Sequence, residues 1–81
     1  MLYVITKTID YEYDSPQTRV EVFNNYEDAL KHLEDVRRNL KGCTDVEFDF
    51  SELFGEATLT YCDNLLMAKV YHTIHPVSNI L

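Results

Sequence analysis

Two rows of acidic residues are the part of this sequence whose residue types and spacing could recognise a partner by charge. In residues 10–14 and again in residues 45–49, a carboxylate occupies every second position: Asp10, Glu12 and Asp14, then Asp45, Glu47 and Asp49. In an extended strand, alternate side chains project from one face about 6.7 Å apart. That spacing resembles successive backbone phosphates, so such rows could occupy the basic nucleic-acid groove of an enzyme. The alternative is an ordinary solvated face, because antiparallel sheets commonly expose one polar face.

Tyrosines next to the acids extend this candidate binding surface. The chain has six tyrosines, and tyrosine is enriched in protein interfaces. Tyr11 and Tyr13 lie between the acids of the first row, so we rank them as contact residues, with cross-strand packing as the alternative role. The predicted partner-binding set is Asp10, Tyr11, Glu12, Tyr13, Asp14, Asp45, Glu47, Asp49, Glu52 and Glu56.

Cysteine and histidine could in principle support metal or nucleophilic chemistry. Two thiolates and two imidazoles can complete a zinc tetrahedron, but the set Cys43, Cys62, His72 and His75 contains no Cys-x-x-Cys knuckle, and a strand would place the two histidines on opposite faces. Cys62 and His72 could pair across the last hairpin as nucleophile and base, although a lone Cys at such a position is usually structural. The sequence therefore predicts no enzymatic activity, no metal site and no cofactor.

Length and charge limit the fold and the class of partner. A chain of 81 residues, of which 46% are hydrophobic, can build one core, so we predict a single domain spanning residues 1–81. Fourteen acidic against seven basic residues give a net charge of -7, which repels nucleic acid and anionic membranes and attracts basic protein surfaces. The amino terminus lacks the pattern of a signal peptide, and the apolar runs are short, so we expect a cytoplasmic protein with reduced cysteines.

The first half of the chain is predicted to form a hairpin followed by a helix. Residues 2–9 are rich in β-branched types and predict a central strand, and residues 19–23 pair back after a turn at Pro16. Asn24 or Asn25 caps a helix in a capping-box arrangement with Glu27, and Gly42 closes it. The apolar side chains at helical spacing predict one buried stripe: Tyr26, Ala29, Leu30, Leu33, Val36 and Leu40.

The second half is predicted to add three strands. Residues 45–50 alternate acid and apolar residues, which predicts that Val46, Phe48 and Phe50 are buried. Residues 57–62 and 65–74 form two further strands joined by a two-residue turn at Asp63–Asn64. The fold class is α+β with element order ββαβββ, one mostly antiparallel sheet packed against a single helix, and the strand order stays open. The apolar tail after Pro76 is expected to dock on its own core or on a second copy.

The amino-terminal half resembles short proteins of bacteriophages and mobile elements. The resemblance rests on three stretches: Met1-Leu2-Tyr3-Val4, Asp10-Tyr11-Glu12, and Val22-Phe23 shortly before Tyr26-Glu27-Asp28-Ala29. Proteins of this class share a strand hairpin and a helix introduced by Val-Phe-x-x-x-Glu-x-Ala, and some small acidic members inhibit host defence, as anti-CRISPR proteins do.

The resemblance points to an origin, not to a function, and carries over no site residue. Together with the acidic rows and the adjoining tyrosines, it gives the first functional hypothesis: a phage-encoded inhibitor that acts in a bacterial host cell by blocking the basic, nucleic-acid-binding surface of a defence enzyme such as a CRISPR-Cas nuclease. The alternative is a structural or regulatory phage protein that self-associates, for example as a homodimer, and has no catalytic activity.

Overall fold

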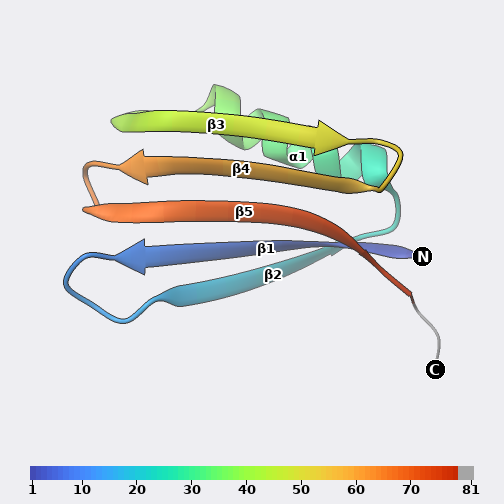
Figure 1. Cartoon of the computed structure of the whole chain (residues 1–81), viewed down its shortest axis with the longest axis horizontal. Helices are drawn as coiled ribbons and strands as arrows, with labels where there is room; N and C mark the ends of the chain where they lie inside the picture. The colour runs from blue at the N-terminus through green and yellow to red at the C-terminus, as the bar shows by residue number, and fades with distance from the viewer. Residues whose placement is uncertain (79–81) are drawn as a thin grey trace.

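Residues 1–78, which this computed structural model describes, form one five-stranded sheet and one helix (Figure 1). Along the chain the elements are β1 (Leu2–Tyr11), β2 (Gln17–Phe23), α1 (Tyr26–Arg38), β3 (Cys43–Ser51), β4 (Glu56–Asp63) and β5 (Ala68–Val77). Every pair of neighbouring strands is antiparallel. The predicted α+β class and the order ββαβββ are therefore confirmed.

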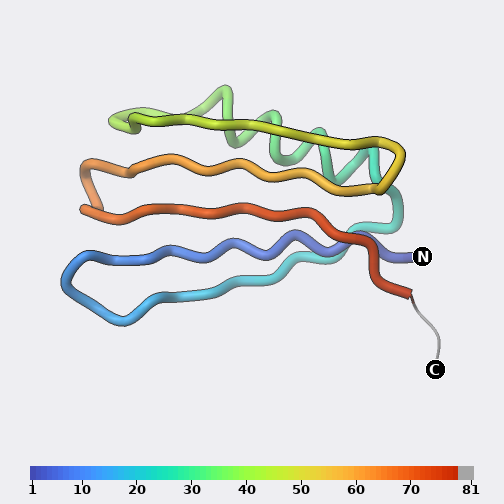
Figure 2. The backbone as a smooth tube through the Cα atoms, viewed as in Figure 1, coloured from blue at the N-terminus to red at the C-terminus, as the bar shows by residue number. Residues whose placement is uncertain are grey.

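The strand order is β2-β1-β5-β4-β3, so the first and last strands of the chain are neighbours near the middle of the sheet. β1 and β5 pair along their whole length, from Leu2 opposite Val77 to Tyr11 opposite Ala68. Figure 2 shows the start of β1 and the end of β5 at the same end of the sheet. β2 and β3 form the two edges, and α1 carries the chain from one edge to the other.

Alternation along the strands gives the sheet two different faces. The face toward α1 contains the apolar core, whose largest fully buried side chains are Leu33, Leu59, Val70 and Ile74. We call the opposite face the open face, because α1 is the only helix in residues 1–78 and lies behind the sheet in the view of Figure 1. The register assigns the following positions to the open face: Leu2, Val4, Thr6, Thr8, Asp10, Thr18, Val20, Val22, Thr44, Glu47, Asp49, Ser51, Glu56, Thr58, Thr60, Cys62, Lys69, Tyr71, Thr73, His75 and Val77.

The helix begins at an asparagine cap and ends earlier than the sequence predicts. The Asn25 side chain accepts a hydrogen bond from the Asp28 amide (2.9 Å) and donates one to the Asp28 carboxylate (3.1 Å). The cap therefore pairs Asn25 with Asp28, through one bond to the Asp28 amide and one between the two side chains, and the predicted capping box with Glu27 was wrong. At the other end, Asn39 is the C-cap. Gly42, predicted to close the helix, instead has a φ of +67° in the turn just before β3.

β3 departs from the strict alternation that its sequence suggests. Thr44 pairs with Cys62 and Glu47 with Thr60, so two residues of β3 lie opposite Tyr61 in a β-bulge. The predicted burial of Val46 and Phe50 was wrong, because they are 43% and 54% exposed. β3 is an edge strand with a neighbour on one side only, and Phe48 is the member of this group that packs against the core.

The turn between β4 and β5 is longer than predicted. The predicted two-residue turn was wrong, because β4 ends at Asp63 and β5 begins at Ala68. One carboxylate oxygen of Asp63 accepts the amides of Leu65 (3.0 Å) and Leu66 (3.1 Å), so this side chain holds the turn. β5 continues through Pro76 to Val77, and the remainder of the predicted docking tail, residues 79–81, lies outside the described residues.

Two glycines with positive φ allow a matched stability test. A Cβ at Gly55 would lie 2.8 Å from a ring carbon of Tyr3, whereas a Cβ at Gly42 would meet its nearest atoms, in Leu65, at 3.5 Å. Both Gly→Ala substitutions place alanine in the left-handed region, which disfavours it by roughly 1–2 kcal/mol. The forced contact with Tyr3 should add about 1 kcal/mol or more at Gly55 alone.

We therefore expect Gly55→Ala to lower the free energy of unfolding, measured by urea denaturation, more than Gly42→Ala does. Equal losses for the two variants would show that the Tyr3 ring moves aside without penalty.

Candidate functional site

The first predicted acidic row is not a row in the folded chain. β1 ends at Tyr11, so Glu12, Tyr13 and Asp14 lie in the turn before β2. The Asp14 carboxylate accepts the Ser15 amide at 2.7 Å, which is a local turn interaction. The prediction of a periodic line of charge was wrong here, because alternate residues share a face only while the strand continues. Asp10 alone remains on the open face.

The second predicted row is shortened by the bulge. Glu47 and Asp49 lie opposite Thr60 and Thr58 of β4, on the open face, and both are exposed. Asp45 is also exposed but lies within the bulge with a φ of 55°. The extra residue takes it out of register with the other two acids, so the row contains two carboxylates instead of three.

The other members of the predicted set lie at different places on the molecule. Glu56, at the start of β4, belongs to the open face, whereas Glu52 lies in the turn between β3 and β4 beside Tyr26. Figure 1 places this turn and the β1–β2 turn, which contains Tyr13, at opposite ends of the sheet. Tyr13 is 80% exposed, while Tyr11 packs partly against the core. The predicted residues therefore do not form one continuous surface.

The acids that the fold does bring together lie on β3 and β4. Glu56 pairs with Ser51, two residues beyond Asp49 along β3, so Glu56 and Asp49 are diagonal neighbours. Such neighbours have Cα atoms roughly 7–8 Å apart. Neither β3 nor β4 contains a lysine or an arginine. Glu47, Asp49 and Glu56 thus form a corner of negative charge, which we call the acidic corner, on the open face.

The sequence did not identify the uncharged residues of the open face as candidate binding residues. Thr8, Tyr71 and Thr60 lie side by side across the three middle strands, and Thr6, Thr73 and Thr58 form the next row. At the β2 edge Val20 and Val22 are 60% and 57% exposed. Alternation could have grouped the residues of each strand by face. It could not have shown which residues of different strands lie side by side, because that depends on the strand order and the register.

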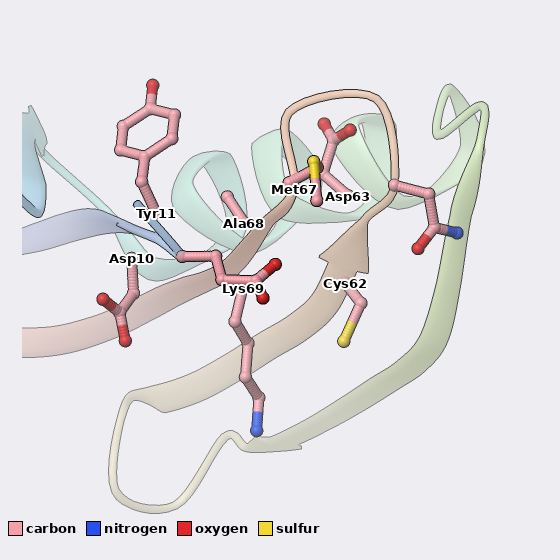
Figure 3. A pocket seen from close by; sticks show the side chains of 9 residues that line it. Asp10, Tyr11, Cys62, Asp63, Met67, Ala68 and Lys69 are labelled. Carbon is pink, nitrogen blue, oxygen red and sulfur yellow. The ribbon is translucent and has the colours of Figure 1, made fainter. Parts of the chain in front are cut away.

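A shallow hollow at the end of the sheet joins the β1–β2 and β4–β5 turns (Figure 3). The Glu12 amide donates to the Met67 carbonyl at 3.1 Å, which holds the two turns together. Figure 3 shows the side chains of Lys69 and Cys62 pointing to one side of the sheet and those of Tyr11 and Ala68 to the other. The hollow therefore wraps around the end of the sheet and does not converge on an enclosed ligand.

Two buried polar groups, Tyr61 and His72, lie on the helix side of the sheet. His72 is 2% exposed, and its Nε2 atom lies 3.0 Å from the Tyr61 hydroxyl. Burial, and then the charges of Lys7 and His32, lower the pKa of His72 to about 4. Burial is also the largest cause that raises the pKa of Tyr61 to about 12. Both side chains are therefore uncharged near neutral pH.

The register of the sheet separates the residues that were considered for nucleophilic catalysis and for zinc binding. Cys62 lies on the open face opposite Lys69, whereas His72 faces α1, so these side chains cannot form the nucleophile–base pair. His75 is on the open face, opposite to His72 as the spacing predicts. Across residues 1–78 no three His, Cys, Asp or Glu side chains are grouped so as to hold a metal ion.

Comparison with known proteins finds no matching family model, no similar curated protein and no similar solved structure. The resemblance to small acidic phage proteins therefore stays a prediction. For the part of the chain that the structure describes, no helix has the length and apolarity needed to cross a membrane.

His72 predicts a particular pH dependence of stability. Because its pKa falls from 6.5 in the unfolded chain to about 4 in the folded one, the unfolded chain binds the extra proton between these values. The free energy of unfolding should therefore fall as the pH falls from 6.5 to 4, by about 3 kcal/mol for this group.

Urea denaturation of His72→Phe across this range should show a flatter pH dependence than the wild type, after a loss of about 1 kcal/mol at pH 7 from the broken hydrogen bond. The control is His75→Phe, on the open face. It retains His72, so its free energy of unfolding should depend on pH as that of the wild type does. An unchanged slope in His72→Phe would contradict the assignment.

Proposed function

We propose that this protein binds a basic surface of another protein through the open face and its acidic corner, and that it acts by blocking that surface. The observation that carries the proposal is the placement of Glu47, Asp49 and Glu56 on neighbouring strands that have no basic residue. None of the three forms an ion pair with another described residue, so their charges are available to a partner.

The side chains of the open face and the net charge of the chain support a protein as the partner. The open face offers threonines and Tyr71 beside the acidic corner, so a partner can gain contact area as well as charge complementarity. A net charge of -7 opposes direct binding to nucleic acid, whereas it favours encounter with a basic groove. The class of partner that fits is a nucleic-acid-binding protein. This protein would cover the basic surface of that partner, so that nucleic acid could not bind there.

The resemblance stated above supports a narrower version of the proposal. In that version the protein is phage-encoded, acts inside the bacterial host, and blocks a defence enzyme such as a CRISPR-Cas nuclease. Glu47 and Asp49 then take the places of two successive phosphates, since alternate strand residues are about 6.7 Å apart.

Self-association through β2 is the alternative function. β2 is an edge strand with two exposed valines, Val20 and Val22, and has no bulge in its pairing with β1. A regular, unpaired edge can pair with the same edge of a second copy. The β3 edge is less suited to this, because the bulge and the acids interrupt it.

The test is affinity capture from a bacterial lysate at low and high salt, with bound proteins identified by mass spectrometry. A nucleic-acid-binding protein retained at low salt and lost at high salt is the expected result. Neutralising the acidic corner in Glu47→Gln/Asp49→Asn should weaken binding of that partner roughly tenfold, because each charge at an interface rim contributes up to about 1 kcal/mol.

The matched control is Glu27→Gln/Glu34→Gln, which removes the same charge from α1 and should leave binding unchanged. The proposal would be contradicted if a partner were captured equally well at high salt and by the Glu47→Gln/Asp49→Asn variant. Recovery of the protein alone, as a dimer in light scattering, would favour self-association through β2.

A further inference from the structure

A second candidate site lies on the helix side of the sheet, away from the open face. It is a partly enclosed cleft of about 250 Å³ between α1 and the strands β1, β2 and β5. Ile5 and Val36 contribute its apolar lining. The remaining lining residues all have polar or charged side chains: Lys7, Arg19, Glu21, His32 and His72.

Two basic residues and one neutral histidine lie side by side in this cleft. Arg19 of β2 pairs with Lys7 of β1, and Lys7 pairs with His72 of β5, so the three form one row across neighbouring strands. His32 of α1 lies across from this row and lines the same cleft. Burial is the largest cause that lowers the pKa of His72, and the nearby charges of Lys7 and His32 lower it further.

The positive charges of Lys7 and Arg19 are not fully neutralised by carboxylates that line this cleft. Among residues 1–78, neither Lys7 nor Arg19 forms an ion pair, and the one carboxylate, Glu21, lies 3.8 Å from His32. With neutral histidines, two positive charges and one negative charge leave the cleft at +1, whereas the whole chain carries -7. The lining of this cleft is therefore positive in a protein whose overall charge is negative.

His72 adds a buried hydrogen-bond donor. The hydrogen bond between the Tyr61 hydroxyl and Nε2 of His72 fits either tautomer of the imidazole, and in the tautomer in which Tyr61 donates, the imidazole proton resides on Nδ1. Within the described residues, every fully buried side-chain nitrogen or oxygen has a hydrogen-bond partner. Nε2 makes the one hydrogen bond recorded for this ring, and His72 lines the cleft, so in that tautomer Nδ1 is the ring atom left to donate to a ligand.

We propose that this cleft binds a small phosphate-type oxyanion, either inorganic phosphate or a small phosphomonoester. Lysine and arginine supply charged donors for such an oxyanion, and His72 supplies a neutral donor from within the core. The volume is below the roughly 300–1,000 Å³ of pockets for larger ligands, which favours a small anion. Polymeric nucleic acid is disfavoured by the size of the cleft and by the charge of the whole chain.

The test is an NMR titration of histidine-labelled protein with inorganic phosphate at pH 7 and constant ionic strength. The imidazole resonances of His72 and His32 should move in a saturable way, whereas chloride at the same ionic strength should leave them unchanged. A small phosphomonoester should produce the same shifts, and acetate, which carries a single charge, should bind more weakly.

Two variants of the cleft and two controls identify the contacts. Lys7→Gln and Arg19→Gln should each weaken phosphate binding roughly tenfold or more, as expected for loss of a charged hydrogen bond. Lys69→Gln on the open face and Arg38→Gln on the exposed side of α1 remove the same charge and should bind as the wild type does. Melting curves of all four variants verify that they are folded.

Three results would overturn the proposal. One is the absence of phosphate-dependent shifts at His72 and His32, and another is wild-type affinity in both Lys7→Gln and Arg19→Gln. Acetate binding as tight as phosphate would overturn the assignment of a phosphate-type ligand. Because the cleft and the open face lie on opposite sides of the sheet, each of these results is independent of the capture experiment with Glu47 and Asp49.

Discussion

The pairing of β1 with β5 is the interaction on which the rest of the structure depends. It joins the amino-terminal hairpin to the β3–β4–β5 meander, and it aligns Ile5 with Ile74 and Ile9 with Val70 beneath the helix. Without it the chain would consist of two small sheets with unpaired edges and half a core each. Because the paired residues lie near opposite ends of the chain, this contact closes the longest loop of the fold and carries the largest loop-closure entropy.

A sheet covered by a single helix has to divide its side chains between a core and a solvated face. α1 supplies Ala29 and Leu33, both fully buried, to one face only. The other face must tolerate water, and its threonines do so while keeping the strand preference of β-branched residues. The same division separates the charges, since the acidic corner is on the open face and the basic row of Lys7 and Arg19 is on the helix side.

The two edges of the sheet differ in how open they are to another strand. β3 carries the bulge at Asp45 and the acids at Glu47 and Asp49, which make the edge irregular and charged. β2 pairs regularly with β1 and leaves Val20 and Val22 exposed. The acids of β3 therefore have a structural role, protection of the edge, that is compatible with the proposed role in binding.

The sequence by itself determined the elements and the fold class, because these follow from local signals. The asparagine cap at position 24 or 25, the helical spacing around Leu33 and the β-branched residues of β1 each act over a few residues. Only the tertiary structure decided the strand order, the bulge at Asp45 and the end of β1 at Tyr11, and the last two of these features broke up the predicted acidic rows. The row of Arg19, Lys7 and His72 likewise exists only after β1 pairs with both β2 and β5, because it joins residues that are distant in the chain.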